Sequence, residues 1–397
     1  MQKINDRLYN WASSLESQAR DQAMRTARLL IVEGHVALMP DAHWGLGSTV
    51  GSVIPTKEAI IPAAVGVDIG CGMIAVETAL GAEHLPDSFE GYRDQAARDI
   101  PAGVGQGHGE ITEQYADWLI AHPAPTVFSE KQSMRAGSQL GSLGSGNHFF
   151  EVCLDEDDRV WLVLHSGSRG IGNELAQIHI GKARRLFEDS GAVIEDKDLA
   201  WLAQGTPEFD AYIADMLWAQ SYAHENRQQM MNAALRGFFH FVGFGEIRET
   251  INCHHNYTNF EDGLWITRKG AISAREGEMG VIPGSMGTCS YIVRGKGNPL
   301  SHFSSSHGAG RVMSRGQARR EIKLDDFRAV MGHTAWQDSD AQYLVDEAPQ
   351  AYKDIDQVMA DQTDLTEAVH ELRQVFNYKG VERNSKRASS SDDGHAH

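Results

Sequence analysis

The chain has 397 residues, 41% of them hydrophobic, so it can bury a large core, and its length allows one big domain or two ordinary ones. Acidic residues (54) outnumber basic residues (36), and the formal net charge of -18 opposes undirected binding to a polyanion. The four cysteines have no close paired spacing, which excludes a disulfide framework or a zinc ribbon and favours a reducing compartment.

The N-terminal stretch lacks a basic segment followed by an apolar run. Nowhere does the sequence approach the ~20 consecutive apolar residues that span a bilayer. We therefore expect a cytoplasmic protein with no membrane partner.

Amphipathic helices are predicted, in chain order, over residues 11–31, 172–188, 207–236, 314–331 and 355–375. The third is the plainest, because Thr206 can cap it, Pro207 suits its first turn and Gly237 follows its expected end. Short apolar runs predict strands at residues 148–153 and 160–165. This order has no regular βαβ period, so the expected fold class is α+β, a mixed α/β sheet protein.

Glycine-rich loops are spread from residue 45 to residue 310, where they suit tight turns and anion cradles. Only one folded unit can bring such distant loops together. We therefore expect a single large domain over residues 1–380. The polar stretch at residues 381–397 is expected to be a disordered tail.

The segment VGVDIGCGM places Asp68 and Cys71 three residues apart among glycines, so both side chains can reach one ion. A thiolate with a carboxylate suits a borderline divalent metal such as Zn, Mn or Fe. From this pair alone, a buried inert cysteine beside a turn-forming aspartate is the alternative.

Histidines gather at strand ends and in glycine loops. His148 starts one predicted strand and His165 ends another, and strand ends that feed loops are where sites tend to form. Strict alternation puts His148 and Glu151 on opposite faces unless the strand begins or bulges between them. A core histidine explains any single case, but the accumulation, with His254, His255 and His307, favours a metal-dependent enzyme.

The segment HGAGR places His307 between glycines and before Arg311. A neutral imidazole can attack phosphorus, while backbone amides and an arginine stabilise the developing charge. The alternative is a loop histidine in a simple glycine turn. No Walker loop is present, so any phosphate chemistry does not use one.

A basic stretch follows directly and is the clearest candidate for contact with any nucleic-acid partner. It is expected to be helical and contains Arg311, Arg315, Arg319, Arg320 and Lys323. A solvated helix face is the alternative.

Read in order, several long blocks resemble the RtcB family of RNA ligases, close to its bacterial branch. They are MPDAHWGLGSTVGSVIPTKEAIIPAAVGVDIGCGM, GSGNHFFEV, LHSGSRGIGN, NCHHNY, TRKGAISAREGEMGVIPGSMG and SHGAGRVMSR. The resemblance spans residues 30–380 and implies the RtcB-type fold, with central sheets around a dinuclear metal site.

The resemblance implies a role for each matching residue. Two manganese ions would be held by Asp68, Cys71, His148, His165 and His255, with the Cys71 thiolate shared. His255 is preferred to His254 because the family's ligand precedes an asparagine, here Asn256. His307 would be the histidine that becomes guanylylated. The expected nucleotide contacts are Asn147, Glu151, Asn256, Ser285, His307, Gly308, Ala309, Gly310, Tyr352 and Lys379.

The implied reaction joins an RNA 3′-phosphate or 2′,3′-cyclic phosphate to a 5′-hydroxyl, using GTP and manganese, through guanylyl-histidine and an RNA-ppG end. RNA repair or tRNA splicing is the implied role, with an archease-like activator as a further partner of an expected monomer. One rival is a metal-dependent phosphodiesterase that acts on cyclic phosphate ends without ligation. The other is a non-catalytic RNA-binding accessory protein.

Overall fold

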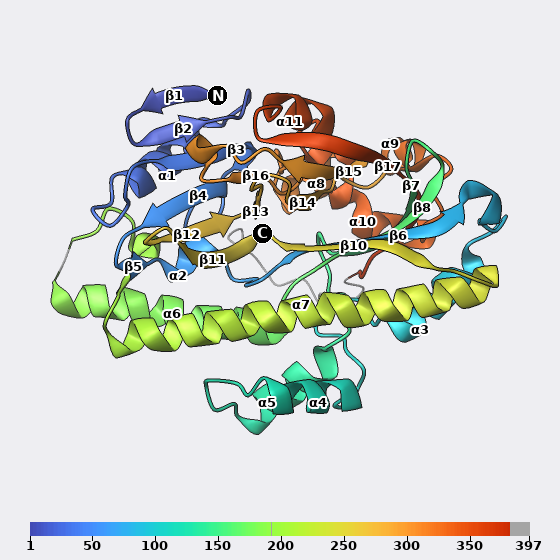
Figure 1. Cartoon of the computed structure of the whole chain (residues 1–397), viewed down its shortest axis with the longest axis horizontal. Helices are drawn as coiled ribbons and strands as arrows, with labels where there is room; N and C mark the ends of the chain where they lie inside the picture. The colour runs from blue at the N-terminus through green and yellow to red at the C-terminus, as the bar shows by residue number, and fades with distance from the viewer. Residues whose placement is uncertain (192, 382–397) are drawn as a thin grey trace.

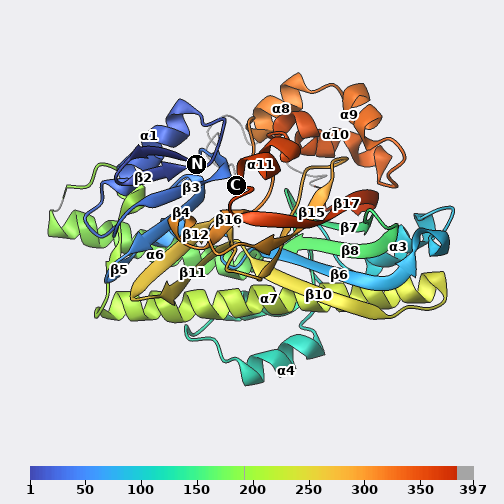
Figure 2. The same ribbon diagram turned by 45° about the horizontal axis from the view of Figure 1, so that its top comes forward.

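The computed structural model describes residues 1–191 and 193–381; apart from residue 381, the predicted tail lies outside this range. Two β-sheets lie over a layer of long helices (Figures 1 and 2). The six-stranded sheet has the order β1 (Gln2–Asn5), β2 (Leu8–Asn10), β3 (Val36–His43), β4 (Val50–Thr56), β12 (Leu264–Lys269) and β11 (Asn256–Glu261).

The seven-stranded sheet carries most of the candidate site. Its order is β10 (Ile247–His254), β6 (Gly72–Gly81), β8 (Arg159–Ser166), β7 (Phe149–Leu154), β17 (Thr366–Tyr378), β15 (Ser290–Gly295) and β14 (Met279–Ile282). Two short pairs complete the strands: β13 (Ala271–Ser273) with β16 (Ser304–Ser306), and β5 (Ala59–Ile60) with β9 (Leu202–Ala203).

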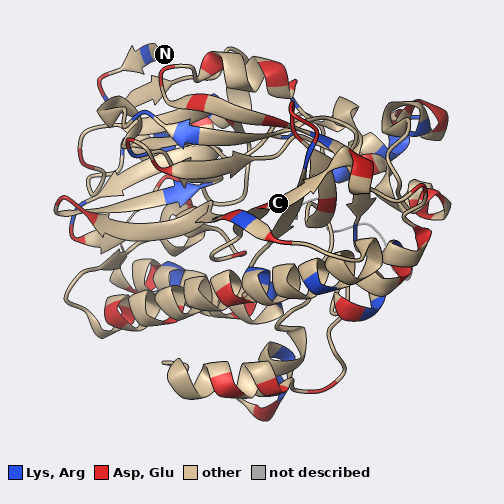
Figure 3. Ribbon diagram, turned by 45° about the vertical axis from the view of Figure 1, so that its right-hand side comes forward, with Lys and Arg blue, Asp and Glu red and all other residues tan. Residues whose placement is uncertain are grey.

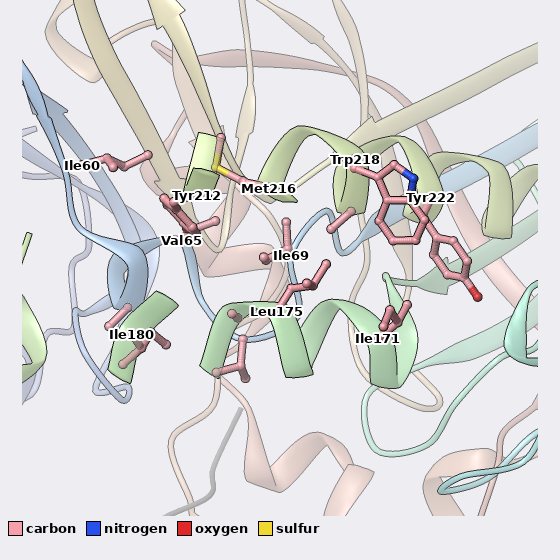
Figure 4. Close-up of a cluster of buried hydrophobic side chains, with 14 of the residues drawn as sticks. Ile60, Val65, Ile69, Ile171, Leu175, Ile180, Tyr212, Met216, Trp218 and Tyr222 are labelled. Carbon is pink, nitrogen blue, oxygen red and sulfur yellow. The ribbon is translucent and has the colours of Figure 1, made fainter. Parts of the chain in front are cut away.

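Helices α6 (Arg169–Ser190) and α7 (Pro207–Val242) form the layer beneath the sheets (Figure 1). Their facing sides bury one apolar cluster, in which Ile171 and Leu175 of α6 meet Tyr212 and Met216 of α7 (Figure 4). Burial of each such side chain contributes about 1.5 to 3 kcal/mol. A second cluster packs α7 against the seven-stranded sheet.

The remaining helices are shorter. They are α1 (Ser17–Ala27), α2 (Pro62–Val65), α3 (Glu90–Asp99), α4 (Glu113–Ala121), α5 (Glu130–Gln139), α8 (Arg315–Glu321), α9 (Leu324–Met331), α10 (Ala341–Leu344) and α11 (Ile355–Asp361). Helices α4 and α5 lie on the far side of α7 from the sheets (Figure 1). None of the helices in the described ranges has both the length and the apolar composition to cross a bilayer.

The expected α+β class is confirmed, as are the helices predicted at 172–188 and 207–236. The second of these runs past Gly237 and ends before Gly243, which has a φ of 91°. A glycine inside a helix costs about 1 kcal/mol, less than the burial of Phe238, the next residue, contributes.

The helix predicted at 355–375 is wrong beyond Asp361, because residues 366–378 form β17, an interior strand between β7 and β15. Register shifts on both sides of β17 break the simple alternation of a strand. The apolar spacing Val369, Leu372 and Phe376 then imitates a helical period.

Two other predicted helices are shorter than expected. The one at 11–31 is confined to α1, and residues 11–16 are not helical. The one at 314–331 is divided into α8 and α9, since Ile322 adopts an extended conformation between them.

Candidate active site

Five potential metal ligands come from four separate segments that meet at one edge of the seven-stranded sheet. The register of the strands brings these segments together. Gly72 at the start of β6 pairs with Ser166 at the end of β8 and with His254 at the end of β10. His165 pairs in turn with Phe149, the first residue of β7. Because neighbouring strands run antiparallel, the start of one lies beside the end of the next. Asp68, Cys71, His148, His165 and His255 are therefore brought together.

The loop that carries Asp68 and Cys71 is shaped by Gly70. Its φ is +71°, and a Cβ there would lie 2.8 Å from Cα of Gln220 on α7. Glycine is therefore needed both for the left-handed backbone and for the close approach to α7. The Cys71 N–H donates to the Asp68 carbonyl and closes the turn.

The ligand atoms form a connected group. Cys71 Sγ lies 3.4 Å from His148 Nε2 and 3.2 Å from His165 Nε2. His148 Nε2 is 3.1 Å from Asp68 Oδ2 on one side, and His165 Nε2 is 3.2 Å from His255 Nε2 on the other. The sulfur thus lies between an Asp–His group and a His–His group.

Backbone carbonyls orient two of the imidazoles. His148 Nδ1 lies 3.0 Å from the Leu143 carbonyl and His165 Nδ1 lies 3.0 Å from the Asn147 carbonyl. These contacts place the ring proton on Nδ1 and direct the Nε2 lone pairs at the sulfur, as in metal-binding histidines. His255 Nδ1 is buried with no hydrogen-bond partner among the described residues.

The chemistry of this donor set fits a borderline divalent metal. Burial lowers the pKa values of His165 and His255 well below their usual range, so both imidazoles are neutral ligands. Burial also raises the pKa of the Cys71 thiol, and a coordinated cation deprotonates such a thiol. Ligand atoms of Cys71, His148 and His165 all lie within 4.8 Å of one another.

His307 adjoins this group, with its ring centroid 4.7 Å from that of His255. Fully buried Asp41 on β3 holds it: Asp41 Oδ2 accepts from the His307 backbone N–H at 3.1 Å and lies 2.6 Å from His307 Nδ1. A carboxylate only accepts, so Nδ1 carries the shared proton and Nε2 keeps its lone pair. Sequence analysis missed Asp41, although the block MPDAHWG contains it.

A pocket on one side of His307 collects most of the expected nucleotide contacts. It is lined by Asn147, Glu151, Ser285, Gly308, Ala309, Gly310, Tyr352 and Lys379. Strand β7 begins at Phe149, between His148 and Glu151, so the two side chains serve different parts of the site. Asn256 lies outside this pocket; its Oδ1 accepts from the Gly270 N–H at 2.8 Å, on the metal-ligand side.

Glu151 is buried at the base of this pocket. Burial raises its pKa to about 8, against the opposing effects of Lys379 and of Asn377, which donates to Glu151 Oε1 at 2.7 Å. A buried carboxylate of this kind can accept two hydrogen bonds from one planar ligand.

Glu347 was also missed, and it anchors the other side of the pocket. Its Oε2 accepts from Lys379 Nζ and from the Tyr352 hydroxyl, each at 2.9 Å. Burial would raise the pKa of Glu347, but the charges of Lys379, Arg315 and Arg311 outweigh it and hold the pKa well below its usual range. No sequence motif singles out this glutamate.

The basic stretch after His307 is largely paired internally. The Arg311 guanidinium donates to the Tyr352 hydroxyl at 2.8 Å, and Arg315 pairs with Asp346 and Glu347. Arg319 also pairs with Asp346 from an exposed position. Arg320 is exposed with no ion pair in the described part of the chain. RNA contact by these four arginines stays a prediction, and exposure favours Arg319 and Arg320.

Most of the chain matches one known family. The family model described as tRNA-splicing ligase RtcB matches residues 22–380. The RNA-splicing ligase RtcB of Escherichia coli (strain K12) is 44% identical over 394 residues, covering 92% of this chain and 95% of that protein.

More distant relatives share the same extent. The RNA-splicing ligase RtcB of Mycobacterium tuberculosis is 31% identical, covering 81% of this chain and 90% of that protein. The tRNA-splicing ligase RtcB of Pyrobaculum aerophilum is 28% identical, covering 94% and 92%. The chain therefore belongs to the RtcB family of RNA-splicing ligases.

Proposed function

We propose that this protein joins an RNA 3′-phosphate or 2′,3′-cyclic phosphate end to a 5′-hydroxyl end, using GTP and two manganese ions, with His307 as the covalent nucleophile. The observation that carries the proposal is the arrangement around His307. Asp41 fixes the ring from one side, five metal-ligand candidates lie on another, and a pocket with convergent polar groups opens beside it.

Asp68, Cys71 and His148 would hold one ion, and Cys71, His165 and His255 the other, with the sulfur shared. When bound, the metals would neutralise charge on the phosphoryl oxygens.

His307 Nε2 would attack the α-phosphorus of GTP, forming the N–P bond as the P–O bond to pyrophosphate breaks. Asp41 would stabilise the imidazolium that develops, because its carboxylate accepts a hydrogen bond from Nδ1–H. The GMP group would pass to an oxygen of the RNA 3′-phosphate, which breaks the N–P bond and forms RNA-ppG. The 5′-hydroxyl would then attack the RNA phosphorus, lose its proton and expel GMP.

Guanine would be recognised at the base of the pocket. Ionised Glu151 can accept from the two N–H groups on the Watson–Crick edge of guanine, and Ser285 lines the adjoining wall. Tyr352 offers a ring face and Lys379 a donor, both positioned by Glu347.

Residues 1–380 would make up this ligase domain. Action as a monomer, a cytoplasmic location and an archease-like activator remain predictions from the sequence.

The test is guanylylation by GTP labelled on the α-phosphate, in the presence of manganese. We expect acid-labile label on the protein and none on His307→Ala. His333→Ala, which removes an exposed histidine, is the matched control and is expected to label like the unaltered protein. Absence of label with every divalent metal would favour the phosphodiesterase, which needs the metal ligands but not His307.

A further inference from the structure

Strand β17 carries two buried amides, Gln374 and Asn377, that contact residues lining the proposed nucleotide pocket. The strand lies between β7 and β15 (Figure 2). Residues three apart on a regular strand point to opposite faces of the sheet. Here Gln374 pairs with Cys153, and Asn377 pairs with Glu151, two residues away from Cys153 on β7. The register shift between Gln374 and Phe376 therefore puts both amides on the Glu151 face.

The shifted part of β17 is held from its other edge by the segment after α9. Thr334 Oγ1 donates to the Gln374 carbonyl at 3.2 Å, and the Ala335 N–H donates to the Val375 carbonyl at 2.9 Å. The Asn377 N–H donates in turn to the Ala335 carbonyl at 2.9 Å. Hydrogen bonds on both edges of the strand thus fix the backbone that carries the two amides.

Gln374 holds the loop that forms one wall of the pocket. Its Nε2 donates to the carbonyls of Ser285 and Thr288, each at 2.9 Å, and its Oε1 accepts from the Gly287 N–H at 3.0 Å. Ser285 lines the pocket, whereas Gln374 lies behind it. Both polar atoms of this amide are committed to the loop, so Gln374 positions the wall.

Asn377 contacts the carboxylate at the base of the pocket. In the described part of the chain two side chains donate to Glu151: Asn377 Nδ2 to Oε1 at 2.7 Å, and Cys153 Sγ to Oε2 at 3.9 Å. Lys379 also attracts this carboxylate, but its ammonium donates to Glu347. An ionised carboxylate has about four lone-pair sites, so one site on each oxygen remains for a ligand.

The two protonation states of Glu151 suit different purines. The ionised form offers two acceptors, which match the N1–H and N2–H donors of guanine. The protonated form offers one donor and one acceptor, which match N1 and the N6–H of adenine. Burial raises the pKa of Glu151 to about 8, whereas Lys379, Asn377 and Cys153 lower it.

The charge of the whole chain also opposes ionisation of Glu151. Its formal net charge is -18, and acidic residues are spread over helices, strands and loops (Figure 3). Like charges disfavour a further carboxylate. A local donor is therefore needed to keep Glu151 in the form that matches guanine.

We infer that Asn377 is a positioning residue for guanine specificity: its hydrogen bond holds Glu151 as an oriented carboxylate that accepts from guanine and does not donate to adenine, while Gln374 holds the adjoining wall. This inference rests on the proposed function, because it concerns the base of the same nucleotide. Both amides act through residues that line the pocket.

The test compares Asn377→Leu with Gln374→Met, since each change removes an amide and nearly keeps its size. Equilibrium binding of GTP and of ATP is measured with manganese between pH 6 and pH 9. The two nucleotides share their phosphates, so the ratio of their affinities reports on the base. Asn377→Leu is expected to lower the preference for GTP by about tenfold or more, the effect of one hydrogen bond to a charged group. Its GTP affinity should begin to fall at a higher pH, because loss of the donor raises the pKa of Glu151.

Gln374→Met is expected to weaken GTP and ATP by the same factor, because both bases share the wall that it loosens. Asn259→Leu, at an exposed position on β11 outside the pocket, is the control and should match the unaltered protein. In the Glu151→Gln background, Asn377→Leu should have no further effect on the preference. If thermal unfolding shows that Asn377→Leu does not fold, Asn377→Asp, which keeps the shape and removes the donor, has the same expected result.

An unchanged preference in Asn377→Leu, or equal losses of GTP and ATP affinity, would overturn the role of Asn377. Labelling of the unaltered protein by GTP carrying a labelled α-phosphate is measured in the same preparations. If that protein is labelled and prefers GTP, such a result rejects the role of Asn377 alone. If neither GTP nor ATP labels it, the proposed function fails and this inference fails with it.

Discussion

At the scale of single residues, the strongest chemical feature is the contact between Asp41 and His307. We predict that Asp41→Asn lowers the guanylylation rate by up to about ten-thousandfold, the loss seen when an aspartate that orients a catalytic histidine is changed in this way. The amide can donate to Nδ1, which moves the ring proton to Nε2 and removes the nucleophilic lone pair. The rate of label transfer from α-labelled GTP measures this.

Asp6→Asn, which changes an exposed aspartate, serves as the control for the loss of one charge. If Asp41→Asn labels as fast as the unaltered protein, Asp41 has no role in orienting His307. Thermal unfolding separates a slower rate caused by the lost orientation of His307 from a general loss of structure.

We predict that Glu151 makes the proposed binding of GTP dependent on pH. Burial raises its pKa to about 8, and only the ionised form accepts two guanine N–H groups. Because the carboxyl is increasingly protonated as pH falls below 8, we expect the apparent Kd for GTP to rise by up to about tenfold per pH unit. Equilibrium binding between pH 6 and pH 9 measures this.

Glu151→Gln keeps the size of the side chain and removes the titration. This variant is expected to bind GTP weakly at every pH, with a flatter profile. A steep fall in affinity below pH 8 in Glu151→Gln would assign the pH dependence to another group.

At the scale of elements, the loop between α2 and β6 depends on its approach to α7. We predict that Gly70→Ala destabilises the fold and weakens metal binding. The left-handed backbone costs about 1 to 2 kcal/mol for alanine, and the new methyl adds an overpacking cost of about 1 to 3 kcal/mol against Gln220. Urea unfolding and manganese titration measure the two effects.

Gly34→Ala is the matched control, because Gly34 also has a positive φ of +64° but nothing within 4 Å of its added Cβ. It should show the backbone cost alone and bind metal normally. Equal losses in the two variants would mean that the packing of Gly70 on α7 contributes nothing.

At the scale of the whole molecule, the metal-ligand candidates come from segments that are far apart along the chain, from Asp68 to His255. A ligand that binds only the folded state stabilises it by about 2.7 kcal/mol at a hundred times its Kd. We therefore predict that chelation lowers the melting temperature and that manganese restores it.

Cys71→Ala removes the shared ligand and should make the melting temperature insensitive to both treatments. Cys289→Ala, at a half-buried cysteine outside the ligand group, is the control. If chelator, manganese and zinc all leave the melting temperature of the unaltered protein unchanged, the proposed metal site is contradicted.

The sequence by itself determined the α+β class, the two long helices and the family, because long apolar periods and extended motif blocks are local in the chain. It also singled out the histidines, Asp68 and Cys71 as a donor set, since ligand chemistry depends on residue type. It failed at β17, where bulges disturb the strand alternation and imitate a helix.

Only the tertiary structure decided which side chains meet. Asp41 contacts His307, which is 266 residues away in the sequence. Glu347 accepts a hydrogen bond from Lys379, which is 32 residues away. Neither partner has a distinctive spacing, because these contacts arise from packing between distant segments. The cavity between α5 and α6 is invisible in sequence for the same reason: its basic lining residues Arg135, Arg169, Arg184 and Lys269 come from three separate segments, α5, α6 and β12, and only folding gathers them in a chain whose net charge is negative.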